Sequence, residues 1–250
     1  QGSSMREVER VIELNDITYA YPGGSTVIDR ASLAVSRDER VGIIGPNGSG
    51  KTTLFHLVMG LLRPASGAIS IFGREMDSEK DFFEARRRIG FLFQNPDDQL
   101  FCPTVLEDVA FGPLNLGRPP SQARAIAQET LATLGIADFV HRVSHKLSHG
   151  EKKLVALASV LAMGPEVLIL DEPTAGLDQD TRGRLVETLD SLGLTLIITS
   201  HEMDFLSRMA GVFYTLSDGR IRPARGITPH THAHVHVGGE YAHRHEDEYP

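Results

Sequence analysis

The sequence predicts an α/β protein whose core is a parallel sheet covered by helices on both sides. Three apolar stretches of strand length support this prediction, at residues 41–44, 166–173 and 194–201. Each runs into polar residues, and segments with helical patterning lie between them, as in βαβ units. With 250 residues, of which 41% are hydrophobic and 23% charged, the chain is long enough to build one sizeable core.

The first part of the chain predicts β structure followed by a strand, loop and helix. Short alternating segments over residues 8–35 flank a Pro-Gly-Gly turn at 22–24, which predicts an antiparallel β unit. The strand at 41–44 leads through a glycine-rich loop into a helix over 51–62, which an Arg-Pro pair ends. This unit places the loop at the carboxyl end of a buried strand.

The middle of the chain is mainly helical. After a strand expected at 89–94, helical patterning recurs at residues 104–111, 121–134 and 151–163. We therefore assign residues 95–164 to an inserted helical lobe. A last helix is expected at 181–192, between the second and third apolar strands.

The two ends of the chain differ in composition from the rest. Residues 1–4, QGSS, resemble what a cleavable tag leaves behind, so we exclude them from the fold. Residues 5–226 form the expected domain. Residues 227–250 have little apolar content and many histidines, which predicts a mobile tail.

Charge and cysteine content restrict the class of protein. A formal net charge of −8 speaks against a nucleic-acid partner, although Arg86, Arg87 and Arg88 could form a local basic patch. The single Cys102 cannot form an intrachain disulfide, so cytosol is the expected compartment. No apolar run reaches the roughly 18 residues of a membrane span, so we expect any membrane link to go through a partner.

Residues 45–52, GPNGSGKT, fit the G-x-x-x-x-G-K-[ST] phosphate-binding pattern between a predicted strand and helix. Glycines let the backbone wrap phosphate, Lys51 reaches the outer phosphates, Thr52 binds Mg²⁺ and Thr53 adds a hydroxyl. A tight turn that merely needs glycines would explain neither Lys51 nor Thr52. The expected nucleotide-binding residues here are Gly45, Pro46, Asn47, Gly48, Ser49, Gly50, Lys51, Thr52 and Thr53.

Two acids end the strand in VLILDEP, and we expect different tasks for them. Asp171 would hold the metal through water, and Glu172 would polarise an attacking water. His201 ends a neighbouring strand and could hydrogen-bond the γ-phosphate. The alternatives are solvated carboxylates that cap a strand and a structural histidine.

Five motifs, GPNGSGKT, FQNPDDQLF, LSHGE, LILDEPTAGLD and ITSH, follow one another in this order. Over residues 8–225 they resemble the nucleotide-binding domain of ATP-binding cassette (ABC) transporters. The resemblance implies an ATPase that uses ATP and Mg²⁺. It also implies a P-loop NTPase fold with a RecA-like parallel-sheet core, an N-terminal antiparallel β subdomain and an inserted α-helical subdomain.

The resemblance also assigns roles to individual residues. Gln94 is the loop glutamine that senses Mg²⁺ and partner, Asp178 ends a loop that crosses to the other subunit, and His201 is the switch histidine. Tyr21 falls where such domains stack an aromatic ring on adenine. Tyr19 is the rival for that position, and simple packing is the alternative role for Tyr21.

LSHGE resembles the signature loop that such domains use to cover ATP held by a second copy. The resemblance therefore implies a homodimer in which Ser148 and Gly150 contact the partner's nucleotide. Ser148 and Glu151 have the spacing of a capping box before an apolar helix. His149 and Glu151 depart from the common LSGGQ, and we expect the Glu151 carboxylate to turn back toward the Ser148 N–H.

Residues 93–117 and LSHGEKK resemble the ATPase subunits of energy-coupling factor importers. The resemblance implies a transmembrane coupling subunit, a substrate-binding membrane subunit and a peripheral position on the cytoplasmic face of the membrane. An arginine of the coupling subunit would need an acidic groove, for which the candidates are Asp97, Asp98, Glu107 and Asp108. Solvated surface acids are the alternative.

The histidine-rich tail favours a metal substrate. In an extended HTHAHVH, side chains at every second residue project to one side about 7 Å apart. The candidate ligands for Co²⁺ or Ni²⁺ are His230, His232, His234 and His236. A purification tag and an inert polar tail are the alternatives.

These observations predict an ATPase that powers import of a transition metal, cobalt first and nickel next. A vitamin importer of the same type is the main alternative. An ABC ATPase of DNA maintenance would need long heptad arms and a basic surface. A small-molecule kinase sharing only the phosphate loop would not explain LSHGE or the Asp171-Glu172 pair.

Overall fold

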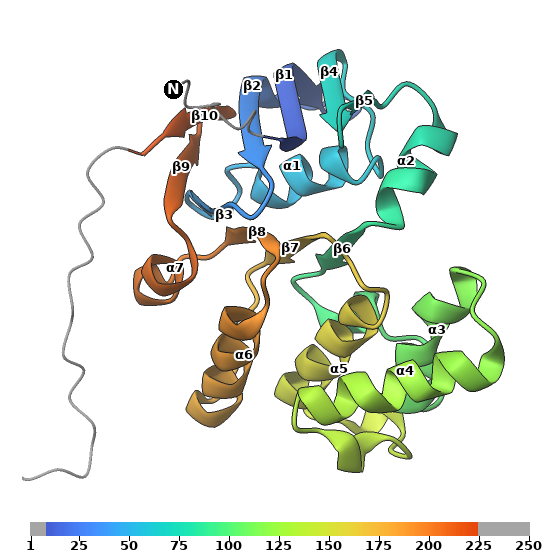
Figure 1. Cartoon of the computed structure of the whole chain (residues 1–250). Coiled ribbons are helices and arrows are strands. Elements are labelled where there is room, and N and C mark those ends of the chain that lie inside the picture. Colours follow the sequence, from blue (N-terminus) through green and yellow to red (C-terminus); the bar gives the residue numbers. More distant parts are fainter. Residues whose placement is uncertain (1–8, 225–250) are drawn as a thin grey trace, which may run out of the picture.

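The structure is a computed structural model, and it describes residues 9–224 (Figure 1). The expected tag remnant and the histidine-rich tail lie outside the described residues. Two sheets, one antiparallel and one mostly parallel, lie above a group of helices. This is the predicted fold class, with the nucleotide-binding motifs at one edge of the mostly parallel sheet.

The antiparallel sheet has the strand order β2-β1-β4-β5. Its first hairpin pairs β1 (Arg10–Ala20) with β2 (Thr26–Ser36) around the predicted turn, where Gly24 N–H donates to the Tyr21 carbonyl at 2.9 Å. Two further strands, β4 (Ser66–Ile71) and β5 (Arg74–Glu75), were not expected. β4 begins with Ser-Gly and β5 consists of two charged residues, so their sequence carries little strand signal.

The mostly parallel sheet has the order β10-β9-β3-β8-β7-β6. The predicted apolar stretches form its centre, listed here in chain order: β3 (Arg40–Ile44), β6 (Ile89–Leu92), β7 (Val167–Asp171) and β8 (Thr195–Thr199). Every residue of β6, β7 and β8 is buried, as expected for strands covered on both faces. β9 (Val212–Ser217) and the edge strand β10 (Arg220–Pro223) beside it were missed.

Alternate residues of the central strands face two separate cores. Val167 and Ile169 pack with α1 (Lys51–Val58) and the antiparallel sheet, whereas Leu168 and Leu170 pack with the helices below. α1 ends four residues before the predicted Leu62. Gly60 has a φ of 67°, and a Cβ on it would lie 2.4 Å from the Phe82 ring, so the chain turns away there.

The remaining helices cover the lower face of the sheet or its flank (Figure 1). The inserted lobe consists of α3 (Val105–Asn115), α4 (Pro120–Thr133) and α5 (His149–Leu161). α6 (Gln179–Ser191) and α7 (Met203–Met209) pack beneath the centre of the sheet, and the unexpected α2 (Glu79–Arg86) lies beside β6. None of the helices within residues 9–224 has the length and apolar content that crossing a bilayer requires.

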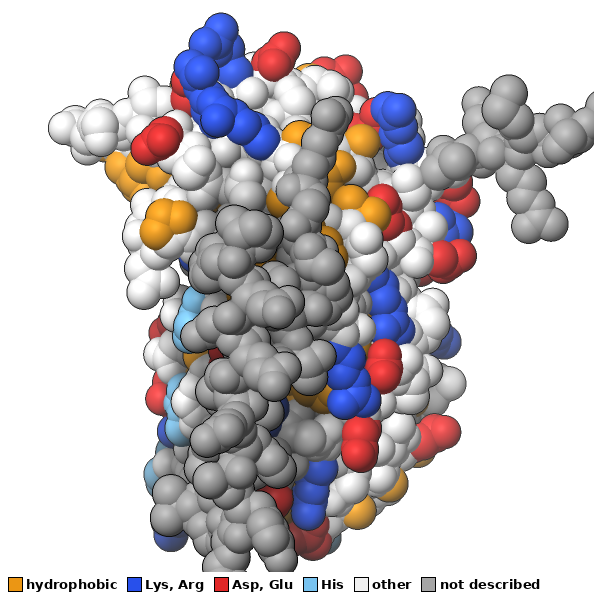
Figure 2. Space-filling view, turned by 90° about the vertical axis from the view of Figure 1, so that its left-hand side faces the viewer, with side chains coloured by type: hydrophobic (Ala, Val, Ile, Leu, Met, Phe, Trp, Pro, Cys, Tyr) orange, Lys and Arg blue, Asp and Glu red, His pale blue; other side chains and the backbone are white. Residues whose placement is uncertain are grey.

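Charges of both signs are visible on the coloured part of the face in Figure 2. Lys and Arg side chains alternate there with Asp and Glu side chains, around a few apolar patches. Arg86 of the candidate basic patch donates to the Met59 carbonyl, and Arg88 pairs with Glu166. Arg87 lies 3.6 Å from Glu84, so all three arginines have partners within the chain.

Candidate functional site

The glycine-rich loop joins β3 to α1 at the carboxyl end of the sheet. Gly50 has a φ of 100° and directly precedes α1, a conformation that residues with a Cβ rarely adopt. At Gly45, a Cβ would lie 2.3 Å from the Leu216 carbonyl oxygen. The loop therefore requires glycine at these positions, and the backbone N–H groups at the start of α1 are available to an anion.

Lys51 and Thr52 point into the site from the first turn of α1. The buried Lys51 ammonium donates to the carbonyls of Gly45 at 2.7 Å and Pro46 at 3.1 Å, so it lies within the curve of the loop. The Thr52 hydroxyl donates to Asp171 Oδ2 at 2.5 Å. This contact joins the phosphate loop to the end of β7.

Asp171 is 1% exposed and both of its oxygens accept hydroxyl protons. Oδ2 accepts from Thr52, and Oδ1 accepts from Thr199 of β8 at 2.6 Å. A buried carboxylate next to a threonine hydroxyl is a suitable donor set for Mg²⁺, which prefers oxygen ligands and keeps several waters. The residues present therefore fit the expected metal.

Glu172 is held in an unusual conformation beside His201. Its φ of 47° lies in the left-handed region, which costs a residue other than glycine about 1–3 kcal/mol. One carboxylate oxygen, Oε2, accepts the His201 backbone N–H at 3.3 Å and lies 2.9 Å from Nδ1 of its ring. The other oxygen, Oε1, is buried and has no hydrogen-bond partner among the described residues. Glu172 therefore keeps one carboxylate oxygen unpaired within the described part of the chain.

Lys51, Thr52, Asp171 and Glu172 line one cavity of about 470 Å³, a usual size for a small-molecule site, whereas His201 is not part of its lining. Its lining joins the phosphate loop, the loop glutamine and the two acids, and it consists of Tyr21, Val27, Asn47, Gly48, Gly50, Lys51, Thr52, Thr53, Gln94, Asp171 and Glu172. Motifs more than a hundred residues apart in the chain therefore meet at one place.

Of the two candidate aromatic residues, Tyr21 borders this cavity. It is 44% exposed, and its hydroxyl lies 3.1 Å from Thr53 Oγ1. Tyr19 is 8% exposed and packs edge to face behind it, with ring centroids 5.1 Å apart. The structure thus leaves the Tyr21 ring available to a ligand and places Tyr19 in the core.

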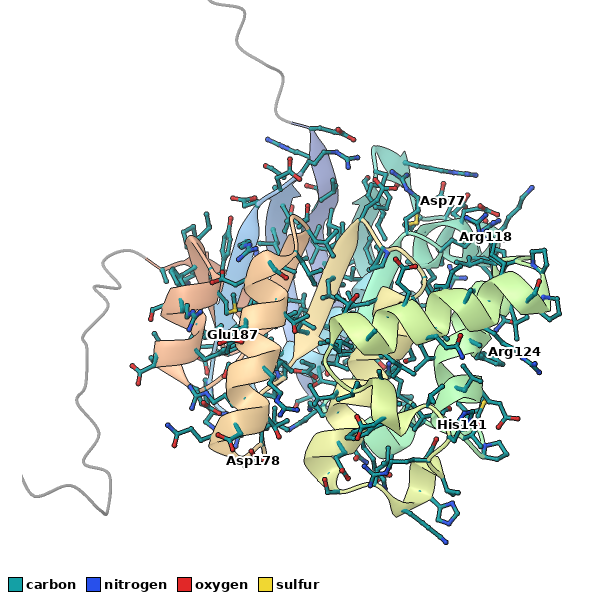
Figure 3. The ribbon with its side chains drawn as sticks, turned by 60° about the horizontal axis from the view of Figure 1, so that its bottom comes forward. Asp77, Arg118, Arg124, His141, Asp178 and Glu187 are labelled. Atoms are coloured by element: carbon teal, nitrogen blue, oxygen red, sulfur yellow. The ribbon has the colours of Figure 1, made fainter. Side chains whose placement is uncertain are left out.

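Ser148, Gly150 and Asp178 do not line the cavity. Ser148 caps α5, and the expected capping box is present: Glu151 N–H donates to Ser148 Oγ at 3.3 Å, and Ser148 N–H donates to Glu151 Oε2 at 2.8 Å. Asp178 caps α6, and the Thr181 backbone N–H lowers the pKa of its carboxyl. Figure 3 shows Asp178 at the amino end of α6.

The loops that carry these residues lie against each other. A Cβ on Gly150 would lie 3.7 Å from Asp178 Oδ2, and a Cβ on Gly176 would lie 3.2 Å from the His149 ring. His149 therefore occupies the space that Gly176 leaves open. The direction of this histidine side chain was not predicted.

Lys153 is a residue of the site that the sequence did not indicate. It is fully buried, and its ammonium donates to the Gln94 carbonyl at 2.5 Å. Burial lowers the pKa of Lys153 to about 8. Consecutive lysines in a helix usually indicate a solvated surface, so no sequence signal separated Lys153 from Lys152.

The expected acidic groove is only partly present. Asp108 is 4% exposed and accepts the backbone N–H groups of Phe101 and Cys102 and the Ser144 hydroxyl, so its role is structural and the prediction for it is wrong. Glu107 caps α3. Asp97 and Asp98 are exposed in the turn after Gln94, and Asp97 pairs with Lys152 at 2.6 Å.

A second cavity of about 460 Å³ lies next to Asp97, between this turn and the segment before α5. Phe101 lines it and is 67% exposed, with its ring edge to face on Phe111 of α3. The described residues contain no group of three or more His, Cys, Asp or Glu side chains that could hold a metal ion. The four tail histidines proposed as ligands lie outside the described residues.

Comparisons with known proteins give the family. A family profile described as ABC transporter matches residues 28–175. A putative ABC transporter ATP-binding protein of Nitratidesulfovibrio vulgaris is 54% identical over 236 residues, which cover 94% of this chain and 86% of the relative. The energy-coupling factor transporter ATP-binding protein EcfA of Methanothermobacter thermautotrophicus is 45% identical over 215 residues, 84% of this chain and 69% of the relative.

The cobalt import ATP-binding protein CbiO of Rhodobacter capsulatus is 45% identical over 215 residues, covering 84% of this chain and 77% of the relative. Among solved structures, CbiO1 from Clostridium perfringens, part of the transporter complex CbiONQ, superposes with a TM-score of 0.76 at 36% identity, covering 86% of this chain and 87% of that chain. A dimeric ATP-binding cassette with ADP and phosphate superposes with a TM-score of 0.77 at 27% identity. The match covers 86% of this chain and 100% of that chain.

Proposed function

Because this chain belongs to the ABC transporter family and is an ABC-type ATPase coupled to transport, we propose that it powers metal import through an energy-coupling factor complex. Co²⁺ is the first candidate substrate and Ni²⁺ the second. The observation that carries the ATPase site is the convergence of Lys51, Asp171 and Glu172 on one cavity.

The named relatives support an importer but do not choose its substrate, because EcfA and CbiO proteins are equally similar to this chain. The alternating histidines at 230–236 favour a metal ion, since imidazole is a common ligand of Co²⁺ and Ni²⁺. A vitamin importer built on the same ATPase subunit is the second candidate.

The phosphate loop binds and orients the triphosphate in this proposal. Backbone N–H groups of residues 47–53 surround the phosphates, Lys51 contacts the outer ones, and the Tyr21 ring stacks on adenine. Thr52, Asp171 and Gln94 would hold Mg²⁺, which would neutralise phosphate charge when it is bound with ATP. The Gln94 position depends on Lys153, whose ammonium holds the backbone of the glutamine loop.

Glu172 is the proposed general base. Its Oε1 accepts a proton from the attacking water in this proposal, because Glu172 lines the cavity and this oxygen has no partner among the described residues. His201 holds Oε2 and thereby fixes the direction of the carboxylate. In the same proposal the exposed side of the His201 ring contacts the γ-phosphate.

Two copies complete the site. Ser148, Gly150 and Asp178 lie away from their own cavity, which supports a head-to-tail dimer in which they cover the partner's ATP. ATP that contacts both copies only in the closed dimer binds that form more tightly, so ATP drives closure and hydrolysis releases it.

The exposed turn at Asp97 and Asp98, with the neighbouring cavity and Phe101, is the proposed contact with the transmembrane coupling subunit. It directly follows Gln94, so a change at the nucleotide reaches this surface through one short segment. In this arrangement the chain is a peripheral protein on the cytoplasmic face of the membrane, and a substrate-binding membrane subunit completes the complex.

The substrate is tested by uptake in cells that express the complete transporter. Cells with the wild-type subunit should accumulate Co²⁺, or Ni²⁺, well above cells with Glu172→Gln, whereas Glu187→Gln on the exposed face of α6 should behave as wild type. Uptake of a vitamin with no metal uptake would favour the second candidate.

Calorimetric titration of Co²⁺ into the full chain and into a chain ending at Gly226 tests the tail separately. Equal isotherms would show that the tail does not bind the metal, and the tail would then no longer support a metal substrate.

A further inference from the structure

The amino end of α5 carries a carboxylate where a phosphate-covering loop favours a neutral side chain. The positive end of the helix dipole attracts anions, so a fixed carboxylate there competes with phosphate for the same potential. An uncompensated Glu151 would therefore repel the nucleotide that Ser148 and Gly150 are proposed to cover.

Arg142 supplies the counter-charge. Its Nη1 donates to Glu151 Oε1 at 2.7 Å, and its Nη2 donates to Oε2 at 3.4 Å. Oε2 also accepts the Ser148 backbone N–H at 2.8 Å. The guanidinium is the largest cause of a lowered pKa at Glu151, so this carboxyl stays ionised and paired.

Arg142 is itself fixed by the helical lobe. Its guanidinium lies 4.5 Å from the centre of the Phe139 ring, and its backbone N–H donates to the Phe139 carbonyl at 2.8 Å. Its carbonyl accepts the N–H of Val105, the first residue of α3, at 3.1 Å. Figure 3 shows the adjacent His141 on this lobe. The guanidinium is thus held by the Phe139 ring as well as by Glu151.

We propose that Arg142 is a positioning residue for the ATP site of the partner copy, because it cancels the charge of Glu151 and holds that carboxylate on the Ser148 N–H. This inference rests on the proposed function of the LSHGE loop. With the carboxylate held there, the Ser148 Oγ accepts the Glu151 N–H and keeps its hydroxyl proton for phosphate. Arg142 acts through Glu151 and Ser148 and makes no contact with the nucleotide itself.

A double-mutant cycle on the full chain tests the inference. Arg142→Met alone should raise the KM for ATP about tenfold, because an ion pair and its charge compensation are lost beside phosphate. In the Glu151→Gln background the same Arg142→Met change should alter KM by less than about twofold, since no charge remains to cancel. Arg142→Lys keeps the charge and should retain most of the wild-type KM. An equal rise in KM in both backgrounds would overturn the inference.

Arg88 offers a matched control. It also forms a two-pronged pair, with Glu166, and its guanidinium also lies over an aromatic ring, Phe72, at 3.5 Å. Arg88 directly precedes β6, at the opposite end of the sheet from the cavity. Arg88→Met should lower the unfolding temperature and leave KM unchanged; if it raises KM as much as Arg142→Met does, Arg142 has no specific role.

Ser148→Ala separates this inference from the proposed function. If Ser148→Ala leaves turnover unchanged, the proposal that Ser148 covers the partner's ATP is wrong, and the role of Arg142 is wrong with it. If Ser148→Ala slows turnover but the Arg142 and Glu151 changes prove independent, only the inference about Arg142 fails.

Discussion

The Glu172 carboxylate lies 2.9 Å from Nδ1 of His201, and this contact holds one of its two oxygens while the other has no hydrogen-bond partner within residues 9–224. The backbone N–H of His201 binds the same oxygen, so the histidine fixes the carboxylate through two groups. Strain at Glu172 and a buried free oxygen are features of a catalytic position, because both destabilise the fold without helping to pack it.

Glu172→Gln should lower the rate of ATP hydrolysis by roughly a thousandfold, as expected for the loss of a general base. ATP binding should survive, because Lys51 and the loop backbone are unchanged, and the dimer should accumulate in its closed form. Phosphate release and size-exclusion chromatography with ATP measure the two effects. Rapid turnover in this variant would reject Glu172 as the base, and Glu187→Gln serves as the control.

Gly45→Ala should destabilise the fold by about 1–3 kcal/mol, since the new methyl group would overlap the Leu216 carbonyl and force the backbone to move. The loop would shift with it, so ATP affinity should fall as well. Gly193→Ala is the comparison, because a Cβ there has nothing within 4 Å. Urea unfolding and nucleotide titration of both variants check the prediction; equal stability of the two would contradict it.

Asp108→Ala should cost about 3 kcal/mol of unfolding free energy, because it leaves buried donors from Phe101, Cys102 and Ser144 without an acceptor. Glu107→Ala removes only an exposed cap and should cost about 1 kcal/mol. Denaturant unfolding of the two variants measures the difference. A smaller loss of unfolding free energy for Asp108→Ala than for Glu107→Ala would contradict the structural role of Asp108.

Charge reversal at Asp97 and Asp98 should weaken co-purification with the transmembrane subunit and spare ATP binding. Both side chains are exposed, and neither lies in the nucleotide cavity lining. Pull-down of the membrane subunit with wild-type and variant chains, together with a nucleotide-binding measurement, gives the result. Unchanged co-purification would remove this turn from the membrane contact.

The ionisation of Glu166 makes part of the free energy of unfolding depend on pH in the acid range. Hydrogen bonds from Arg88 and from Arg37 lower the pKa of the Glu166 carboxyl to about 2 in the folded chain, from its ordinary value of 4.5. A lowered folded pKa stabilises the fold above the unfolded value, and this stabilisation is lost as pH falls from about 4.5 to about 2. The side chain is 35% exposed, so salt should reduce the effect.

The measurement is the unfolding free energy as a function of pH for wild type and Glu166→Gln. The variant should show a shallower loss of stability between pH 4.5 and 2. Parallel curves for the two proteins would show that the Arg88 pair contributes no pH-dependent stability.

The parts of the fold that the sequence predicted are those with a strong local signal. Buried strands such as β7 and β8 are continuous apolar runs, and the Gly45–Thr53 loop has a pattern that few other structures require. The strands β9 and β10 are only partly buried and mix apolar with polar residues, so their identity depends on pairing with distant segments.

The site residues also divide into those with a local sequence pattern and those without one. Residue types and spacing predicted Lys51 and Asp171, because their chemistry is local to a motif. Burial of Lys153 and of Asp108 depends on which helix face meets the glutamine loop, and that is set by tertiary packing of α3 and α5. No local pattern carries this information.

The contact of His149 with Gly176 makes the amino ends of α5 and α6 neighbours within one copy of the chain. In the proposed dimer these two ends would therefore lie side by side over one partner triphosphate, and the packing of His149 against Gly176 would favour their leaving it together.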